Sequence, residues 1–419
     1  MTDVATPTRA RADLPQPEPG LTPEMLIERA AAMRPLLREQ QEANDHRGHY
    51  SDEVHKAFAD AGFYRILQPK MFGGYAFDPA VFLKVVMEIS RGHPATGWCF
   101  ALAGSHAYFL GAHWSEAVQR ELFGDHGEFR AAHVVGPFGT MTRADGGYLV
   151  DGVWPFSSGI PVSTHFIGGS LAPQPDGSMK HVFFVVPKNQ ITILPDWGEG
   201  RFMGMQGSGS NSVRLDKLFV ADRFVIDANM MLSSEAMPDL TPGVHLHGDP
   251  MYLAVVIGWF HCEFGAITSG TARAALDEFG ELARTKSIMT NPQLKRIHDP
   301  FVQNLYARAL GLADSAEALT LAAVELYTEQ CRRTVRDRTP LRATETFKVW
   351  GIARNACVMA CEAVDILFHA AGASTGRRDQ RLQRYYRDIE MYRLHIQSQP
   401  TLPTMRGRVE FGLPPEIFG

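Results

Sequence analysis

The sequence predicts an α+β protein in which a helical domain, a small β domain and a bundle of long helices follow one another. Apolar residues recur every three to four positions in the first third of the chain and again after Met251. Between about Arg130 and Phe224 they alternate with polar residues instead. A chain of 419 residues has room for two or three such units. We expect a lead at 1–20, a helical domain at 21–128, a β domain at 129–235 and a bundle at 245–405.

The N-terminal region begins with a lead rich in proline and charge, "MTDVATPTRARADLPQPEPG", which we expect to be disordered. Helical spacing starts in "TPEMLIERAAAMRPLLREQQEAND", where Thr22 is a suitable N-cap and Pro23 suits the first helical position. A second helix is predicted in "SDEVHKAFADAGFYRIL", with Ser51 as its cap and acids in the first turn. These signals make the first domain helical.

The middle region consists of short runs rich in β-branched and aromatic residues, such as "HFIGGSLA" and "HVFFVVP". Turn signals such as "ADGG" and "QPDGS" separate some of them. The last region contains much longer helical patterns, such as "FVQNLYARALGLADSAEALTLAAVELYTEQCRRTV". Long helices joined by short links predict an antiparallel bundle after the compact β domain.

Composition places the chain among ordinary globular proteins, with 45% hydrophobic and 21% charged residues. The formal net charge of -5 does not favour nucleic acid or an anionic membrane as a partner. The apolar run "MYLAVVIGWF" from Met251 is too short to span a bilayer. Five cysteines are an odd number and no secretory signal opens the chain, so we expect free thiols and a cytoplasmic location.

Three short stretches combine small, polar and aromatic residues in a way that suggests chemistry. They are "WPFSSG" from Trp154, "GMQGSGS" from Gly204 and "YYRDIEMYRLHI" from Tyr385. In the first, a predicted strand ends in two serines and a glycine, which is either a surface turn or a place where hydroxyls meet a flat polar molecule. For that motif alone the turn is the better interpretation.

Together, in this order and at these spacings, the three stretches resemble the acyl-CoA dehydrogenase superfamily over nearly the whole chain after the lead. Within it, "WPFSSG" resembles the group D flavin monooxygenases, the oxygenase components of two-component aromatic hydroxylases. No glutamate lies between His395 and Thr404, where the common dehydrogenases carry their base, and no Gly-x-Gly-x-x-Gly opens a helix after a strand. The resemblance therefore implies an oxygenase whose flavin is reduced elsewhere.

The resemblance implies a cofactor, a partner and a class of substrate. Reduced FMN or FADH2, supplied by a separate NAD(P)H:flavin reductase, would react with O2 to give a C4a-hydroperoxyflavin that hydroxylates a small aromatic, phenolic substrate. The family resemblance also points to a homotetramer. Apolar helix faces would supply the interface, for example through Leu310, Leu312, Ala316, Leu319 and Ala323.

The same resemblance assigns flavin contacts. Ser158 would accept a hydrogen bond from the flavin N5 proton with Ser157 as the alternative, and a hydroxyl there would slow loss of the oxygen adduct as hydrogen peroxide. Trp154 and Phe156 would be the aromatic walls, and Gly207, Ser208 and Ser210 would supply backbone donors. The phosphate-binding cations would be Arg273, Arg284 and Lys286, and His369 would lie near the flavin. For each cation taken singly a solvated helix face is the better interpretation, and a helix C-terminus explains His369 equally well.

Three histidines are assigned to the substrate. His395 matches the family's catalytic histidine, and a neutral imidazole could take the proton of a phenol, whose pKa in solution is about 10. His106 lies on an otherwise apolar predicted helix and would contact the aromatic substrate, while His133 falls where the family places a polar substrate contact. A buried core histidine remains the alternative for His106, and an ordinary helix-face residue for His395.

Other functions stay open at this stage. The same flavin adduct could oxidise nitrogen or sulfur instead, the chain could be an acyl-CoA dehydrogenase-like enzyme, or it could be a silent scaffold that acts by binding. "HLHGDP" from His245 alternates ligand types but has no evident third strong ligand. Cys357 and Cys361 share a helix face, which core packing explains. We therefore predict no metal site.

Overall fold

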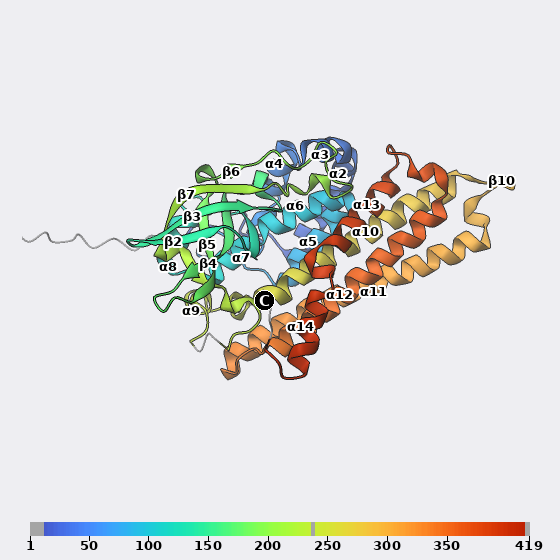
Figure 1. The fold of residues 1–419 in the computed structure, drawn as a ribbon. Helices are drawn as coiled ribbons and strands as arrows, with labels where there is room; N and C mark the ends of the chain where they lie inside the picture. Colours follow the sequence, from blue (N-terminus) through green and yellow to red (C-terminus); the bar gives the residue numbers. More distant parts are fainter. Residues whose placement is uncertain (1–11, 236–238, 415–419) are drawn as a thin grey trace, which may run out of the picture.

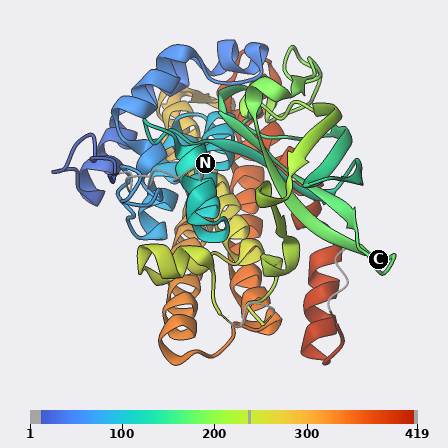
Figure 2. The ribbon, with the colours of Figure 1, turned by 90° about the vertical axis from the view of Figure 1, so that its left-hand side faces the viewer.

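A computed structural model describes residues 12–235 and 239–414. The strands form one end of the molecule, the N-terminal helices lie beside them, and the long helices of the bundle extend away from both (Figure 1). Turned by 90°, the view shows the strands and the N-terminal helices side by side in front of the bundle (Figure 2). The three expected regions thus follow one another along the chain and meet near the centre of the molecule.

The N-terminal domain is helical, as its spacing predicts. Thr22 caps the first helix by accepting a hydrogen bond from the Met25 amide, and Ser51 caps α4 through the amide of Val54. The helices α6 and α7 are buried on nearly every side, which matches their almost wholly apolar sequence. The helices are α1 (Pro23–Ala32), α2 (Arg34–Glu39), α3 (Gln41–Arg47), α4 (Asp52–Asp60), α5 (Pro79–Gly92), α6 (Pro94–Gly104), α7 (His106–His113) and α8 (Glu116–Phe123).

The lead differs from its prediction. Residues 1–11 lie outside the described residues, but residues 12–20 lie against the N-terminal domain rather than forming a disordered extension. Leu14 pairs with Phe72 in a short β-bridge, and Glu18 makes a two-pronged ion pair with Arg29 of α1. Composition pointed to disorder because proline and charge dominate the segment, whereas specific backbone and ionic contacts hold it in place.

The β domain contains two four-stranded sheets within the described residues, ordered β1-β4-β5-β8 and β2-β3-β7-β6. Their inner faces enclose a separate small core that includes Trp154, Phe166 and Phe184. All pairs are antiparallel except β1 with β4. The strands are β1 (Ala131–Pro137), β2 (Thr140–Ala144), β3 (Gly147–Trp154), β4 (His165–Pro173), β5 (Met179–Pro187), β6 (Thr192–Ile193), β7 (Val213–Ala221) and β8 (Val225–Asp227).

The C-terminal bundle is built around α10, which is buried along most of its length because it packs on α5 as well as on α11 and α12. A small hairpin of β9 (Ser287–Ile288) and β10 (Asn291–Lys295) marks the far tip of the bundle (Figure 1). The helices are α9 (Pro242–His247) in the link, then α10 (Val256–Thr285), α11 (Pro300–Asp337), α12 (Ala343–Ala371), α13 (Arg381–Leu394) and α14 (Thr401–Glu410).

All five cysteines are buried and carry free thiols. Among the helices of the described residues, none combines the length and apolarity needed to cross a membrane. No group of three or more His, Cys, Asp or Glu side chains in the same part of the chain is arranged to hold a metal ion.

Candidate functional site

The turn that carries Ser158 leaves the β domain where β3 ends and is tied to two other segments. The Ser157 amide donates to the Asn211 carbonyl, and the Gly159 amide donates to that of Ser208, both at 3.1 Å. Gly159 has a φ of +80°, and a Cβ there would lie 2.8 Å from the carbonyl oxygen of Cys99 in α6. Only glycine satisfies both conditions, so this residue lets the turn approach the helix.

A chain of buried hydroxyls starts at this turn. Trp98 of α6 donates its indole N–H to Ser158 Oγ at 3.1 Å, and Ser158 Oγ lies 2.7 Å from Ser210 Oγ. Ser210 Oγ in turn lies 2.7 Å from Ser208 Oγ. A hydroxyl has one donor and two acceptor positions. When Ser158 donates to Ser210, it keeps one lone pair free to accept a proton donor from a bound molecule.

Ser157 and Trp154 face away from this hydroxyl chain. The Ser157 hydroxyl is wholly buried and donates to the Trp154 carbonyl at 3.0 Å. The Trp154 indole donates to the Gly169 carbonyl at 2.8 Å and packs on Phe166 and Phe184 inside the β domain. Strand alternation turns this position inward, so in this structure Trp154 offers no surface to a bound ring, in contrast to the predicted wall.

Phe156, the other predicted wall, lies on the surface beside the turn. Its side chain is 60% exposed and its backbone has a φ of +56°, an uncommon conformation for a bulky residue. The rings of Trp197 and Phe202 lie edge-on to it at 6.1 and 6.4 Å. An exposed ring held in a strained backbone, next to the Ser158 turn, is suited to contact a planar ligand.

His395, at the end of a bundle helix, lies beside Trp98. It is the C-cap of α13, and its partly buried ring lies 5.6 Å from the Trp98 ring and 4.9 Å from that of Phe264. Burial lowers the pKa of His395 to about 4, so the imidazole is neutral at physiological pH. A neutral imidazole beside two aromatic rings can accept a proton from a bound aromatic molecule.

Trp98 connects these parts, and the sequence reasoning missed it. It bonds to Ser158, stacks on Phe264 of α10 at 4.8 Å and faces His395. The available signal was its spacing, because Trp98 lies two helical turns before His106 and shares a face with it. That signal was weak, since α6 is apolar all round and no single face stands out.

His106 and His133 lie beside each other, farther along the row of aromatic residues that begins with His395, Trp98 and Phe264. Their rings lie 5.1 Å apart, and the ring of Phe260, one turn before Phe264 on α10, lies 5.6 Å from His106 and 5.7 Å from His133. His106 Nδ1 lies 2.6 Å from the Leu102 carbonyl oxygen, so this nitrogen carries the proton and Nε2 is left as an acceptor. Side chains of the three helices α6, α7 and α10 thus line one strip from His395 to His133.

The side chains of His106 and His133 form a polar but uncharged part of the site. Burial lowers the pKa of His106 to about 4 and, with the nearby histidines, that of His133 well below its usual range. Both ring nitrogens of His133 are buried and have no hydrogen-bond partner among the described residues. The titratable side chains that act on His133 are those of His106, His181 and His113, whose own pKa values burial lowers. Such a place suits a hydroxyl or carbonyl and not an unpaired carboxylate.

Ser208 and Ser210, which were predicted from "GMQGSGS" to offer backbone donors, lie beside Ser158, but the Ser208 amide already donates to the Met205 carbonyl at 3.0 Å. Gly207 belongs to η4 (Gln206–Ser208), and a Cβ added to it would come within 3.3 Å of Asp45 Oδ1 and 3.2 Å of the His93 ring. Ser208 and Ser210 form the hydroxyl chain already described. The loop from Met205 to Ser210 is therefore buried between the β domain and the N-terminal helices.

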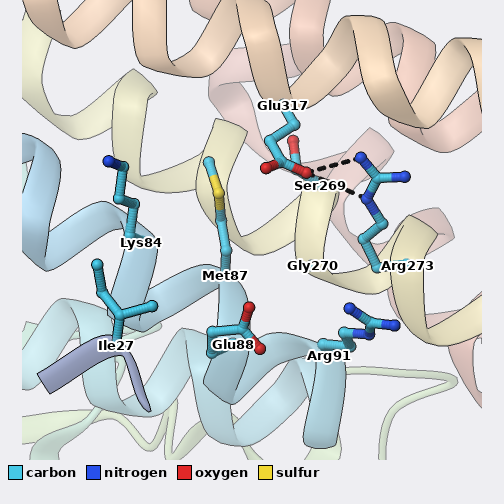
Figure 3. Close-up of a pocket in the computed structure, with 9 residues that line it drawn as sticks. All are labelled: Ile27, Lys84, Met87, Glu88, Arg91, Ser269, Gly270, Arg273 and Glu317. Carbon is cyan, nitrogen blue, oxygen red and sulfur yellow. Dashed lines mark hydrogen bonds and ion pairs between the residues drawn. The ribbon is translucent and has the colours of Figure 1, made fainter. Parts of the chain in front are cut away.

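Arg273 lies elsewhere, in a pocket between α1, α5, α10 and α11 (Figure 3). The pocket has a volume of about 410 Å³ and is lined by both acids and bases, including Lys84, Glu88 and Arg91. The Arg273 guanidinium makes ion pairs with Asp314 at 2.7 Å and with Glu317 at 2.8 Å. Two carboxylates already balance its charge, so it is poorly placed to bind a phosphate.

Arg284, Lys286 and His369 share the far tip of the bundle. Arg284 lies roughly 30 Å along α10 from Phe264, given 1.5 Å of rise per residue. The Arg296 side chain, beside the hairpin at this tip, donates to the Ala370 and Ala371 carbonyls and so places the end of α12, with His369, at the same tip. These exposed residues do not join the Ser158 site of their own chain.

Two family models match the chain: the acyl-CoA dehydrogenase N-terminal domain over residues 26–124 and the acyl-CoA dehydrogenase C-terminal domain over residues 262–400. The segment between them contains the β domain and the Ser158 turn. The matched segments are the two helical regions that supply Trp98 and His395.

Named relatives match over nearly the full chain. The flavin-dependent monooxygenase oxygenase subunit HsaA of Rhodococcus jostii (strain RHA1) is 30% identical over 93% of this chain and 98% of its own. The oxygenase component of p-hydroxyphenylacetate 3-hydroxylase from Acinetobacter baumannii is 24% identical over 95% and 92%. The crystal structure of 3-HSA hydroxylase from Rhodococcus sp. RHA1 superposes with a TM-score of 0.82 at 27% identity, over 93% of this chain and 97% of that one.

Proposed function

The chain belongs to the oxygenase components of flavin-dependent monooxygenases, built on the acyl-CoA dehydrogenase fold, and we propose that it hydroxylates a phenolic substrate at the cluster of Ser158, Trp98 and His395. Its activity is aromatic hydroxylation with reduced flavin and O2. The observation that carries the assignment of the site is the Trp98 side chain, which bonds to Ser158 and faces His395. One residue thus joins the expected flavin contact to the expected base.

The residues around Ser158 fit a reduced flavin. When Ser158 donates to Ser210, its remaining lone pair matches an N–H donor such as flavin N5, and the exposed Phe156 can cover a planar ring. The bound flavin supplies the electrons that activate O2. Ser158 holds the N5 proton in place, which favours oxygen transfer over release of hydrogen peroxide, and Trp98 with Ser210 fixes the Ser158 hydroxyl.

His395 acts on the substrate. Because its imidazole is neutral, it accepts a hydrogen bond from the phenol hydroxyl and orients the ring towards the flavin side of Trp98. Phe264 and Trp98 give the substrate ring an apolar lining that excludes water. The proton of the phenol passes to His395 as the ring is attacked.

His106 and His133 hold the substrate at its other end. His106 Nε2 accepts and His133 can donate, so a neutral hydroxyl, which does both, satisfies the two nitrogens together. A carboxylate would find no cation among the groups that act on His133. We therefore expect neutral phenols to be better substrates than phenolic acids.

The reduced flavin comes from a separate NAD(P)H:flavin reductase, in keeping with the oxygenase-subunit name of the Rhodococcus relative. We propose the homotetramer to which the family resemblance points, and the distant cations are compatible with it. Arg284 and Lys286 lie farther from the Ser158 site of their own chain than a flavin extends, so they can bind a flavin phosphate only across a subunit interface. A monomeric protein that hydroxylates at full rate would contradict this part of the proposal.

The test uses the purified protein with a flavin reductase, NADH, FMN or FAD, and a panel of neutral phenols under ¹⁸O₂. We expect one ¹⁸O atom in the product and no turnover when the reductase is left out. Neutral thioethers and amines run in parallel. If these are oxidised and every phenol is not, the aromatic-hydroxylase proposal fails in favour of heteroatom oxidation.

A further inference from the structure

A second buried polar group of side chains joins the N-terminal domain to α13 beside the hydroxyl chain, and the proposed reaction does not use it. Asp45 of α3 accepts a hydrogen bond from Arg384 Nε at 2.9 Å, and its other oxygen lies 3.3 Å from His93 Nε2. Asp388, one turn after Arg384, is also buried. Asp45, His93, Arg384 and Asp388 are called the interdomain cluster below.

The interdomain cluster holds the loop that carries Ser208 and Ser210. Asp388 Oδ1 accepts a hydrogen bond from the Met205 amide at 2.6 Å, and the Arg387 guanidinium donates to the Met203 carbonyl. Between them, Gly204 lies so close to α13 that an added Cβ would be 2.2 Å from the Arg387 carbonyl oxygen. The start of the loop is thus fixed to one face of α13.

The other end of the same loop carries the hydroxyl partners of Ser158. Met205 has a φ of +51° and is the N-cap of η4, and the Ser208 amide donates back to the Met205 carbonyl at 3.0 Å. Ser208 and Ser210 follow, and Ser210 bonds to Ser158. A displacement of Met205 therefore moves the partners of Ser158.

The helix that fixes this loop also ends at His395, two turns beyond Asp388. Resting on the proposed function, we propose that Asp388, assisted by Arg387, is a positioning residue that ties the Met205–Ser210 loop to α13 and so keeps Ser158 and His395 in a fixed relation. Oxygen transfer needs both side chains in place at once, and small errors in such geometry are costly.

The surroundings of Asp388 favour its neutral form. Burial, then the nearby Asp45, raises the pKa of Asp388 to about 6, while His93, Arg387 and the Met205 amide oppose this. Although burial opposes its ionisation, His93 and Arg384 hold the pKa of Asp45 below its usual value. Asp388→Asn keeps an oxygen for the Met205 amide and removes the charge, which makes it the conservative variant.

The test is hydrogen exchange, followed by mass spectrometry, on the flavin-free full chain. Asp388→Ala should speed exchange in peptides that cover 203–211 by about ten- to hundredfold, the effect of losing one buried hydrogen bond. Asp388→Asn should exchange no faster than the parent protein in these peptides. Asp277→Asn is the matched control, because Asp277 binds Arg91 at 2.7 Å and joins α5 to α10 away from the loop. It should leave peptides 203–211 unchanged.

A coupling assay with reductase, flavin and a phenol gives the second readout. The share of NADH that ends as hydrogen peroxide should rise in Asp388→Ala and return towards the parent value in Asp388→Asn. Parent-like exchange at 203–211 in Asp388→Ala overturns the proposal, as does faster exchange spread evenly over the whole chain. If Asp388→Ala does not fold, Arg387→Met replaces it with the same two criteria. A parent protein that hydroxylates nothing refutes the proposed function, yet the exchange result still decides the positioning role.

Discussion

Replacing Ser158 by alanine tests the core of the site, because one hydroxyl joins the β domain, α6 and the predicted flavin edge. Ser158→Ala removes the acceptor of the Trp98 indole N–H and one partner of Ser210, while Ser210 keeps Ser208. Two effects follow from the structure, one on stability and one on coupling.

The effect on stability comes from Trp98, which is only 5% exposed. A buried donor left without an acceptor costs about 1–3 kcal/mol, so the free energy of unfolding should fall by that amount. The effect on coupling comes from the lone pair that Ser158 offers to flavin N5. Loss of one such hydrogen bond should shift the ratio of hydrogen peroxide to hydroxylated product by about ten- to hundredfold.

Urea unfolding of the flavin-free protein measures the first effect, and a reductase-coupled assay of NADH, hydrogen peroxide and product measures the second. Ser163→Ala is the matched control, because the Ser163 hydroxyl is buried in the same turn and donates to the Gly159 carbonyl at 2.8 Å. We expect this variant to lose stability and to stay coupled. If Ser158→Ala releases no more hydrogen peroxide than Ser163→Ala, the assignment of Ser158 is wrong.

Three further outcomes are expected. Trp98→Phe keeps the stacking on Phe264 but removes the N–H donor to Ser158, so hydrogen peroxide should rise with little change in substrate KM, and a pure KM effect would speak against this role. His395→Ala should slow product formation, with recovery as pH rises towards about 10, where a phenol ionises unaided; a flat pH profile in this variant would point to heteroatom oxidation. Asp388 has a pKa raised from 3.8 to about 6, so its protonated form stabilises the folded state and that stability is lost as pH rises through 6. Asp388→Asn should therefore raise the urea midpoint at pH 8 relative to the parent and change it little at pH 4, and an equal shift at both would refute the reasoning.

The order of domains could be predicted because it depends on local hydrophobic period, which each segment carries by itself. The strand ending at Trp154 was predicted in the same way, yet its alternation also shows why this tryptophan faces the core. Val150 and Trp154 have the same parity in β3 and are both wholly buried. A residue four places along a strand points to the same face, so applying the period to the motif itself would have removed Trp154 from the site.

Other parts of the site could not be predicted from one sequence. Trp98 acts through contacts with a turn 60 residues away and with α10, and no local pattern encodes such contacts. The distance of the two cations at the tip of the bundle from the site could not be predicted either. Arg284 and Lys286 look suitable by residue type, and only the length of α10 shows how far they lie from Ser158.

The low pKa of His395 limits what this residue can do before the substrate reacts. Moving a proton from a phenol of pKa about 10 to an imidazole of pKa about 4 would cost about 8 kcal/mol at 1.36 kcal/mol per unit. The attraction between the resulting phenolate and imidazolium recovers about 4 kcal/mol at 4 Å and an effective dielectric constant of 20. The bound phenol therefore stays largely protonated and donates a hydrogen bond to His395. Attack on oxygen draws electrons from the ring and makes the hydroxyl proton much more acidic, so His395 takes that proton during oxygen transfer and not before it.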